Sequence, residues 1–229
     1  MRSVYLIIIL LFLLNCNPSS SIPEYVKVLE NEIQTVIDRE IEVVKSYGID
    51  LTKLPKVILE KSVYLIYIDI VSYEIVVTSW EMLDTDERYF FNNLTVENPR
   101  NHYEDIIYWY FVAHEMGHYF QSQAGLDTLS PYESEKMANE LAVAFLKLNI
   151  DDSLRLMNLK KDCEVALSVL TCPTPVGQSD SLFFNSNYLI LANSLPNYSY
   201  YQYTFILDAI SNITNLVFPV LLEDMFGLN

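Results

Sequence analysis

Basic residues are scarce in this sequence. The chain has 14 lysines and arginines against 30 aspartates and glutamates, which gives a formal net charge of −16. A nucleic-acid-binding protein needs a basic patch to displace counterions, and adsorption to an anionic lipid surface also needs positive charge. The composition therefore predicts no nucleic-acid partner. No stretch is dominated by Gly, Pro or Ser, so the 229 residues are expected to fold into a globular domain with a hydrophobic core.

Cysteine is also rare, with three residues and no CxxC pair. This pattern does not support a cysteine zinc site or thioredoxin-type chemistry. Cys163 and Cys172 lie nine positions apart and can close a small disulfide loop in an oxidising compartment. The alternative is two buried free thiols.

The N-terminus carries one short apolar run, from Val4 to Leu14, after Arg2. Its eleven residues are too few to span a bilayer, which takes about 20, but they suit the apolar region of a secretory signal. The run ends at Asn15-Cys16 and resembles a bacterial lipoprotein signal, although such signals usually place Gly, Ala or Ser before the cysteine. The resemblance implies a signal peptide at residues 1–15, a lipid on Cys16 and a tether at residues 16–22. It also implies membrane anchoring in the bacterial envelope, with the body facing the periplasm or the exterior. An ordinary cleaved signal or a short membrane anchor would equally place the body outside the cytoplasm.

Residues 23–229 show no internal repeat and are expected to form a single domain of the α+β class. Apolar residues at three- and four-residue steps predict a helix over residues 23–47. Residues 55–83 are rich in Val, Ile and Tyr and predict two or three strands of a small mixed sheet, followed by a polar loop at 84–99. The C-terminal part is expected to be mostly helical, around 153–170 and 203–227, with a Tyr-rich loop (NYSYYQY) before the last helix.

Two further helices have clear boundary signals. Asn101 with Glu104 predicts the start of a helix over 102–124, and Gly125 is the residue type expected just past its C-terminus. Ser130, Pro131 and Glu133 then give a cap, a first-turn proline and a capping box for a helix over 131–148.

The first of these helices contains the motif HEMGH at residues 114–118. Positions four apart lie on the same helix face, so His114 and His118 can hold one Zn²⁺ together. Glu115 is rotated by about 100° and can act as a general base without binding the metal. The alternative is that both histidines are core residues whose ring nitrogens are hydrogen-bonded within the protein. A buried carboxylate at Glu115 is costly without a metal nearby, however, and a glycine at 117 within a helix suggests close approach of a second helix.

The motif alone occurs often by chance, so a third ligand is required. Glu135 on the following helix can complete a His₂Glu site with one open position, and Asn139, one turn later, can hydrogen-bond the spare nitrogen of a histidine ligand. Asp127 and Glu133 are alternative ligands, although Glu133 is better explained as the capping residue.

These residues resemble the gluzincin metallopeptidases, in particular their minimal forms, over residues 102–148. The resemblance implies a zincin-like arrangement in which an active-site helix is followed by a glutamate helix and an edge strand lines the cleft. It implies that zinc binds His114, His118 and Glu135, and that Glu115 is the catalytic base for hydrolysis of a peptide or protein substrate. A metzincin would need Gly at 121 and His at 124, where this chain has Gln121 and Ala124.

A residue that stabilises the oxyanion is not selected by the sequence. Four tyrosines are candidates, and the third histidine, His102, lies about three turns before the motif. The tyrosines are Tyr132, Tyr198, Tyr200 and Tyr201.

The function predicted on these grounds is a zinc metallopeptidase carried by a membrane-anchored lipoprotein. Two other functions stay open. The chain could be a catalytically inactive, zinc-binding surface lipoprotein that binds a partner, or the motif could be an accident in a domain without metal.

Overall fold

The computed structural model describes residues 24–228. The predicted signal peptide at 1–15, the tether at 16–22 and the lipidation site Cys16 lie outside these residues. Across residues 24–228, none of the helices combines the length and the apolar character that a membrane span requires.

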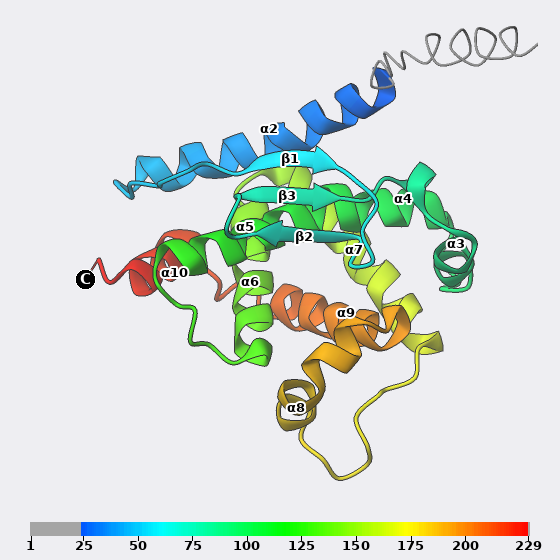
Figure 1. Ribbon diagram of the computed structural model, residues 1–229. Helices are drawn as coiled ribbons and strands as arrows, with labels where there is room; N and C mark the ends of the chain where they lie inside the picture. Colours follow the sequence, from blue (N-terminus) through cyan, green and yellow to red (C-terminus); the bar gives the residue numbers. More distant parts are fainter. Residues whose placement is uncertain (1–23, 229) are drawn as a thin grey trace, which may run out of the picture.

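Helix α2 (Glu24–Ser46) confirms the helix predicted over 23–47. It runs along β1 and the central helix α5 and covers this side of the molecule (Figure 1). Its buried stripe recurs at helical spacing, as the apolar pattern predicted, and Gly48 follows its end with a φ of +78°. The stripe comprises Val26, Ile33, Ile37, Ile41 and Val44.

Three short strands form the mixed sheet that the sequence predicted: β1 (Lys56–Leu59), β2 (Ile66–Asp69) and β3 (Glu74–Val77). Their order is β1-β3-β2, with β1 parallel and β2 antiparallel to β3. Strand β2 is therefore an edge strand, and it packs on α5. The α+β class is confirmed, and the sheet edge lies beside the helix that carries the HEMGH motif.

The predicted loop at 84–99 is wrong over residues 85–92, which are helical, and correct over residues 93–98. A short 3₁₀ turn (Trp80–Met82) leads into helix α3 (Thr85–Asn92). Asp84 and Glu87 form a complete capping box at its start. The polar composition of this stretch concealed a helix-start signal, because the same Asp and Asn residues favour both turns and helix caps.

The predicted helix over 102–124 begins earlier and is less regular. Helix α4 (Pro99–Glu104) leads through a π-helical stretch (Asp105–Tyr110) into α5 (Phe111–Gln123). The N-cap is Asn98, whose side chain accepts a hydrogen bond from the backbone N–H of Asn101, so the predicted cap at Asn101 is wrong. The helix end is correct, since Gly125 has a φ of +72°.

Helix α6 (Pro131–Leu146) begins as predicted, with Ser130 as its cap and Glu133 completing the capping box. Four helices follow: α7 (Ile150–Val169), α8 (Asp180–Ala192), α9 (Leu195–Ser211) and α10 (Phe218–Phe226). Helix α8 was not predicted, and the predicted Tyr-rich loop lies within α9. Its tyrosines are helical because Tyr201 and Tyr203 are buried, and tertiary packing of this kind overrides the weak helix propensity of tyrosine.

Helices α8 and α9 share a small core of their own, made by Phe184, Leu191, Tyr201 and Phe205. Cys163 and Cys172 are free thiols and do not form the disulfide that their spacing allows. Cys163 is buried in α7 and Cys172 is exposed in the connection to α8.

Glu40 on α2 is fully buried, and neither of its carboxylate oxygens has a hydrogen-bond partner within residues 24–228. Burial raises its pKa well above the ordinary value, and Arg39 offsets this only in part. The native state therefore holds the Glu40 proton at a pH where the unfolded chain has lost it. Its contribution to stability is present at low pH and falls as the pH rises from the unfolded pKa of about 4.5 towards the folded pKa.

We expect Glu40→Met to raise the free energy of unfolding at pH 8 by about 1–3 kcal/mol, because it removes two unsatisfied buried oxygens at similar volume. The variant should also lose the part of the pH dependence that Glu40 causes. Urea unfolding between pH 5 and pH 8 measures both effects. Glu42→Gln, at an exposed position of the same helix, should leave the profile unchanged. Equal profiles for wild type and Glu40→Met would contradict the assignment.

Candidate metal centre

The candidate metal centre lies where α5 crosses α6. A Cβ atom added at Gly117 would lie 2.8 Å from Cα and 3.1 Å from the carbonyl oxygen of Ala138. Contacts under 3.0 Å are not tolerated between such atoms, so only glycine permits this crossing. The close approach that the mid-helix glycine suggested is therefore confirmed, and it brings the face of α6 that carries Glu135 against the two histidines.

Three donor atoms converge at the crossing. His114 Nε2 lies 3.1 Å from His118 Nε2 and 3.2 Å from Glu135 Oε2, and His118 Nε2 lies 3.7 Å from the same oxygen. His114 and Glu135 are buried, and His118 is partly exposed. The structure thus brings together the three ligands that the sequence predicted.

This triangle fits a metal ion. Ligands bound tetrahedrally at about 2.0–2.1 Å lie roughly 3.4 Å apart, close to the three separations observed. Two imidazoles and one carboxylate are also a donor set that divalent transition metals accept. The buried group of His114, His118 and Glu135 can therefore hold a metal ion.

Glu135 is held from three sides. Burial alone would raise its pKa, but hydrogen bonding with His114 and His118 keeps the pKa well below the ordinary value. Its Oε1 accepts hydrogen bonds from the hydroxyls of Tyr198 (2.7 Å) and Tyr188 (3.3 Å). Its Oε2 accepts one from the side-chain amide of Gln202 (2.8 Å). Helices α8 and α9 therefore fix the carboxylate as an anion that points at the histidines.

The two histidines are supported differently. His118 Nδ1 lies 3.1 Å from Gln121 Oε1 and 3.3 Å from Ser134 Oγ. Burial lowers the pKa of His118, but its contacts with Glu135, Glu115 and Gln121 outweigh this and raise the pKa to about 9. His114 Nδ1 is buried without a hydrogen-bond partner among residues 24–228, and its ring packs edge-on against Phe111 instead.

Asn139 does not support a histidine, so that prediction is wrong. Its amide donates to the Glu135 carbonyl (2.8 Å) and to Gln202 Oε1 (3.4 Å), while its side-chain oxygen accepts from the Tyr110 hydroxyl (2.9 Å). Asn139 is fully buried on the same helix face as Glu135 and stabilises the packing of α6 on α9. The four-residue spacing correctly predicted that Asn139 shares a helix face with Glu135, but it did not predict the hydrogen-bond partners of Asn139.

Glu115 stands next to the donor triangle without belonging to it. The backbone N–H of Ile68 on strand β2 donates to its Oε2 at 3.0 Å. Burial raises the pKa of Glu115, and the charges of His118 and His114 lower it only in part. The carboxylate is thus tied to the sheet edge and faces the same cleft as the three donors.

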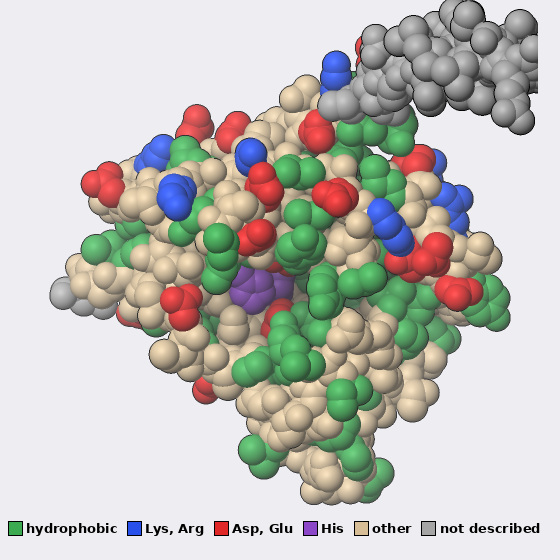
Figure 2. Space-filling view, in the orientation of Figure 1, with side chains coloured by type: hydrophobic (Ala, Val, Ile, Leu, Met, Phe, Trp, Pro, Cys, Tyr) green, Lys and Arg blue, Asp and Glu red, His purple; other side chains and the backbone are tan. Residues whose placement is uncertain are grey.

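The cleft has a volume of about 690 Å³. Strand β2 and the residues before it form one wall, α8 and α9 form the other, and the metal centre lies between them. Figure 2 shows the histidine side chains in a hollow bordered by apolar side chains. The open side of the donor triangle therefore faces a space that can accept a ligand.

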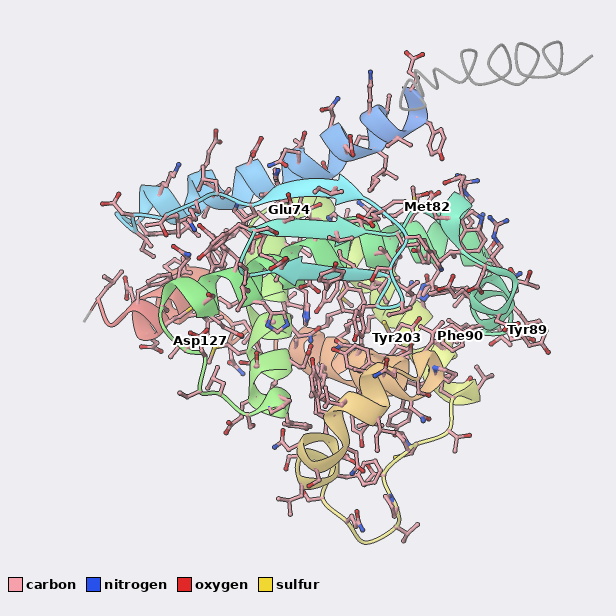
Figure 3. The ribbon with its side chains drawn as sticks, in the orientation of Figure 1. Glu74, Met82, Tyr89, Phe90, Asp127 and Tyr203 are labelled. Carbon is pink, nitrogen blue, oxygen red and sulfur yellow. The ribbon has the colours of Figure 1, made fainter. Side chains whose placement is uncertain are left out.

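The alternative ligands lie outside the donor group. Asp127 is on the α5–α6 connection (Figure 3). It lines the cleft but does not belong to the group of three donors. Glu133 accepts hydrogen bonds from the backbone N–H and the hydroxyl of Ser130, as its capping role requires. His102 is buried with its Nε2 3.0 Å from the Tyr203 hydroxyl and is not part of the centre.

Of the four candidate tyrosines, Tyr198 reaches the centre, where its hydroxyl donates to Glu135. Tyr132 packs against Phe184 and Phe205, and Tyr201 pairs with Thr174. Tyr200 packs on the ring of Tyr201.

Sequence reasoning missed five residues that complete the centre. Gln121 lies one turn after His118, and that spacing could have identified it. The other four come from other elements and carry no local signal. They are Ile68, Ser134, Tyr188 and Gln202.

No protein-family model, curated protein or solved structure matches this chain.

Gly117→Ala should separate α5 from α6 and weaken metal binding. Overpacking costs about 1–3 kcal/mol, which exceeds the roughly 1 kcal/mol that alanine gains in helix propensity. Chemical denaturation and metal titration of the variant measure the two effects. Adding Ala138→Gly should restore little, because the closest contacts are to the Ala138 backbone. A Gly117→Ala protein with unchanged stability and affinity would show that the crossing is not tight.

We expect one divalent metal ion per chain, lost in His114→Ala and in Glu135→Gln. The amide of the second variant keeps an oxygen for the tyrosine hydroxyls but removes the charge that a metal needs. Equilibrium dialysis followed by metal analysis gives the stoichiometry, and saturating metal should stabilise wild type by about 2.7 kcal/mol at 100 times Kd. Asp127→Asn and Glu133→Gln are the matched controls and should bind metal normally. Loss of metal in either control, with retention in Glu135→Gln, would reject the assigned ligand.

Proposed function

We propose that the chain is a zinc-dependent metallopeptidase of gluzincin type. Zinc is held by His114, His118 and Glu135, and Glu115 is the catalytic base. The protein is a lipoprotein that is anchored to a bacterial membrane through Cys16 and faces the periplasm or the exterior.

The observation that carries the proposal is the position of Glu115. A protein that only binds zinc needs the three donors and gains nothing from a second buried carboxyl group beside them. Here the carboxylate is buried, accepts a hydrogen bond from a single backbone N–H and lines the cleft. Such an arrangement costs stability, so we attribute it to chemistry.

The arrangement of elements supports the same proposal. The active-site helix α5 is followed by the glutamate helix α6, and the edge strand β2 runs along the cleft, as in a zincin-like fold.

In this proposal a bound zinc ion supplies Lewis acidity, which polarises a carbonyl group and makes water more acidic. The chain's own residues do the rest. Ile68 N–H holds Glu115 Oε2, so Oε1 is left to take the proton from the attacking water and to deliver it to the leaving amine. The Tyr188 and Tyr198 hydroxyls are engaged with Glu135 Oε1 and keep that carboxylate turned toward the histidines.

Glu115→Gln should keep zinc and lose hydrolysis. The amide oxygen can still accept from Ile68 N–H, so the fold and the metal are retained, while the group can no longer take up a proton. We expect kcat to fall by about 10²- to 10⁴-fold. The measurement is hydrolysis of a broad library of quenched fluorescent peptides, with zinc content determined on the same samples.

Equal behaviour of wild type and Glu115→Gln across the library would favour the alternative function, a zinc-binding surface lipoprotein without catalysis. Asp127→Asn serves as the matched control for activity. It also removes a carboxylate at the cleft, yet it should leave hydrolysis of uncharged peptides close to wild type.

A further inference from the structure

The walls of the cleft are almost free of charge. No lysine or arginine lines it within residues 24–228, and its acidic residues are Glu115, Glu135 and Asp127. The wall made by α8 and α9 comes from the segment 165–207, in which Asp180 is the single charged residue. The chain has a net charge of −16, but this wall carries almost no charge.

Apolar side chains replace charge on both walls. On the sheet side the cleft is lined by Val63, Tyr64, Ile66 and Ile70, and on the helical side by Leu189, Ala192 and Leu195. The floor between them includes Phe91, Ile106 and Phe111. Pockets of this kind bind apolar ligand surface, with a few polar groups fixing orientation.

The rims of the cleft are apolar although they face solvent. Leu189 is 76% exposed and Val63 is 74% exposed, and both line the cleft from opposite walls. Exposed apolar side chains that gather around a binding cleft mark an interaction surface, since isolated ones would be scattered. The cleft can therefore bury apolar groups that extend beyond the metal centre.

We infer that the substrate is an internal apolar segment of a polypeptide chain, an inference that rests on the proposed peptidase function. Leu189 and Val63 determine this specificity from the two rims. Burial of apolar side chains on these walls supplies the binding free energy. Acidic segments are disfavoured because the cleft contributes carboxylates and no lysine or arginine to meet them.

The same charge distribution argues against cleavage at a chain's C-terminus. A terminal carboxylate would enter a cleft that offers no lysine or arginine within the described residues, and its desolvation would not be compensated. A peptide with a blocked C-terminus should therefore bind better than the same peptide with a free carboxylate.

The test uses a peptide with an acetylated N-terminus, an amidated C-terminus and a centre of Phe and Leu. Leu189→Lys and Val63→Lys should each lower kcat/KM for this probe by about tenfold, as expected for losing part of an apolar contact. Each has a control of similar exposure on the same part of the molecule. Ile190→Lys on α8 (71% exposed) and Val71→Lys in the β2–β3 turn (81% exposed) change equally exposed residues that do not line the cleft, and both should stay within about twofold of wild type.

A second readout separates this inference from the proposed function. Binding of the same peptide, fluorescently labelled, to the Glu115→Gln protein should show the same loss in Leu189→Lys and Val63→Lys backgrounds, with no turnover involved. Binding with this pattern but no hydrolysis by wild type would support the specificity and overturn the peptidase. Hydrolysis that prefers a glutamate-centred peptide or a free C-terminus would overturn the specificity and leave the peptidase standing. Neither binding nor hydrolysis would overturn both.

Discussion

The close crossing of α5 and α6 is the constraint on which the rest of the site depends. The helices approach so closely because Gly117 has no side chain where Ala138 passes. Moving α6 outward by the thickness of a methyl group would carry Glu135 away from the histidine nitrogens, which now lie 3.2 and 3.7 Å from its Oε2. The tolerance of a metal centre is smaller than that displacement. Gly117 provides no donor atom, yet it sets the geometry of the three donor residues.

The sheet and the C-terminal helices act on this crossing from opposite sides. Strand β2 reaches α5 through the hydrogen bond from Ile68 N–H to Glu115. Helices α8 and α9 reach α6 through Tyr188, Tyr198 and Gln202, all on Glu135. Glu115 and Glu135 are therefore oriented by different parts of the chain, and the cleft lies between those parts.

Because the residues around the site come from distant parts of the chain, the sequence could predict only some of them. Local signals sufficed for the two site helices, since the pair His114 and His118 and the capping box at Ser130 are short-range patterns. Glu135 followed from the demand for a third donor. The sequence did not predict Tyr188 or Gln202, because they lie 53 and 67 positions from Glu135 and meet it only after folding.

The errors have the same origin. The Tyr-rich stretch in α9 is polar and aromatic in composition, but burial of Tyr201 and Tyr203 makes it helical. Asn139 was placed on the correct face, but its side-chain oxygen accepts from Tyr110 and its NH₂ group donates to the Glu135 carbonyl and to Gln202, so no histidine is its partner. Periodicity predicts which face a residue occupies, whereas its partner depends on which other elements arrive there.

The three buried glutamates among residues 24–228 differ in how far their charge is satisfied. Glu135 has two histidines, two tyrosines and a glutamine around it, and its pKa is lowered. Glu40 has no hydrogen-bond partner within residues 24–228, and its pKa is raised well above the ordinary value. Glu115 stands between them, with one backbone N–H and two nearby histidines.

In the mechanism that we propose, Glu115 must both take up and release a proton, and its intermediate degree of charge satisfaction suits this role. A carboxylate as fully satisfied as Glu135 would be too weak a base to take a proton, and one as isolated as Glu40 would hold its proton too tightly to release it. Glu115 is also the only one of the three that combines a free edge on the cleft with a position outside the donor triangle. Burying Glu115 costs free energy, and the stability of the surrounding core offsets this cost, as we expect for the base that we propose.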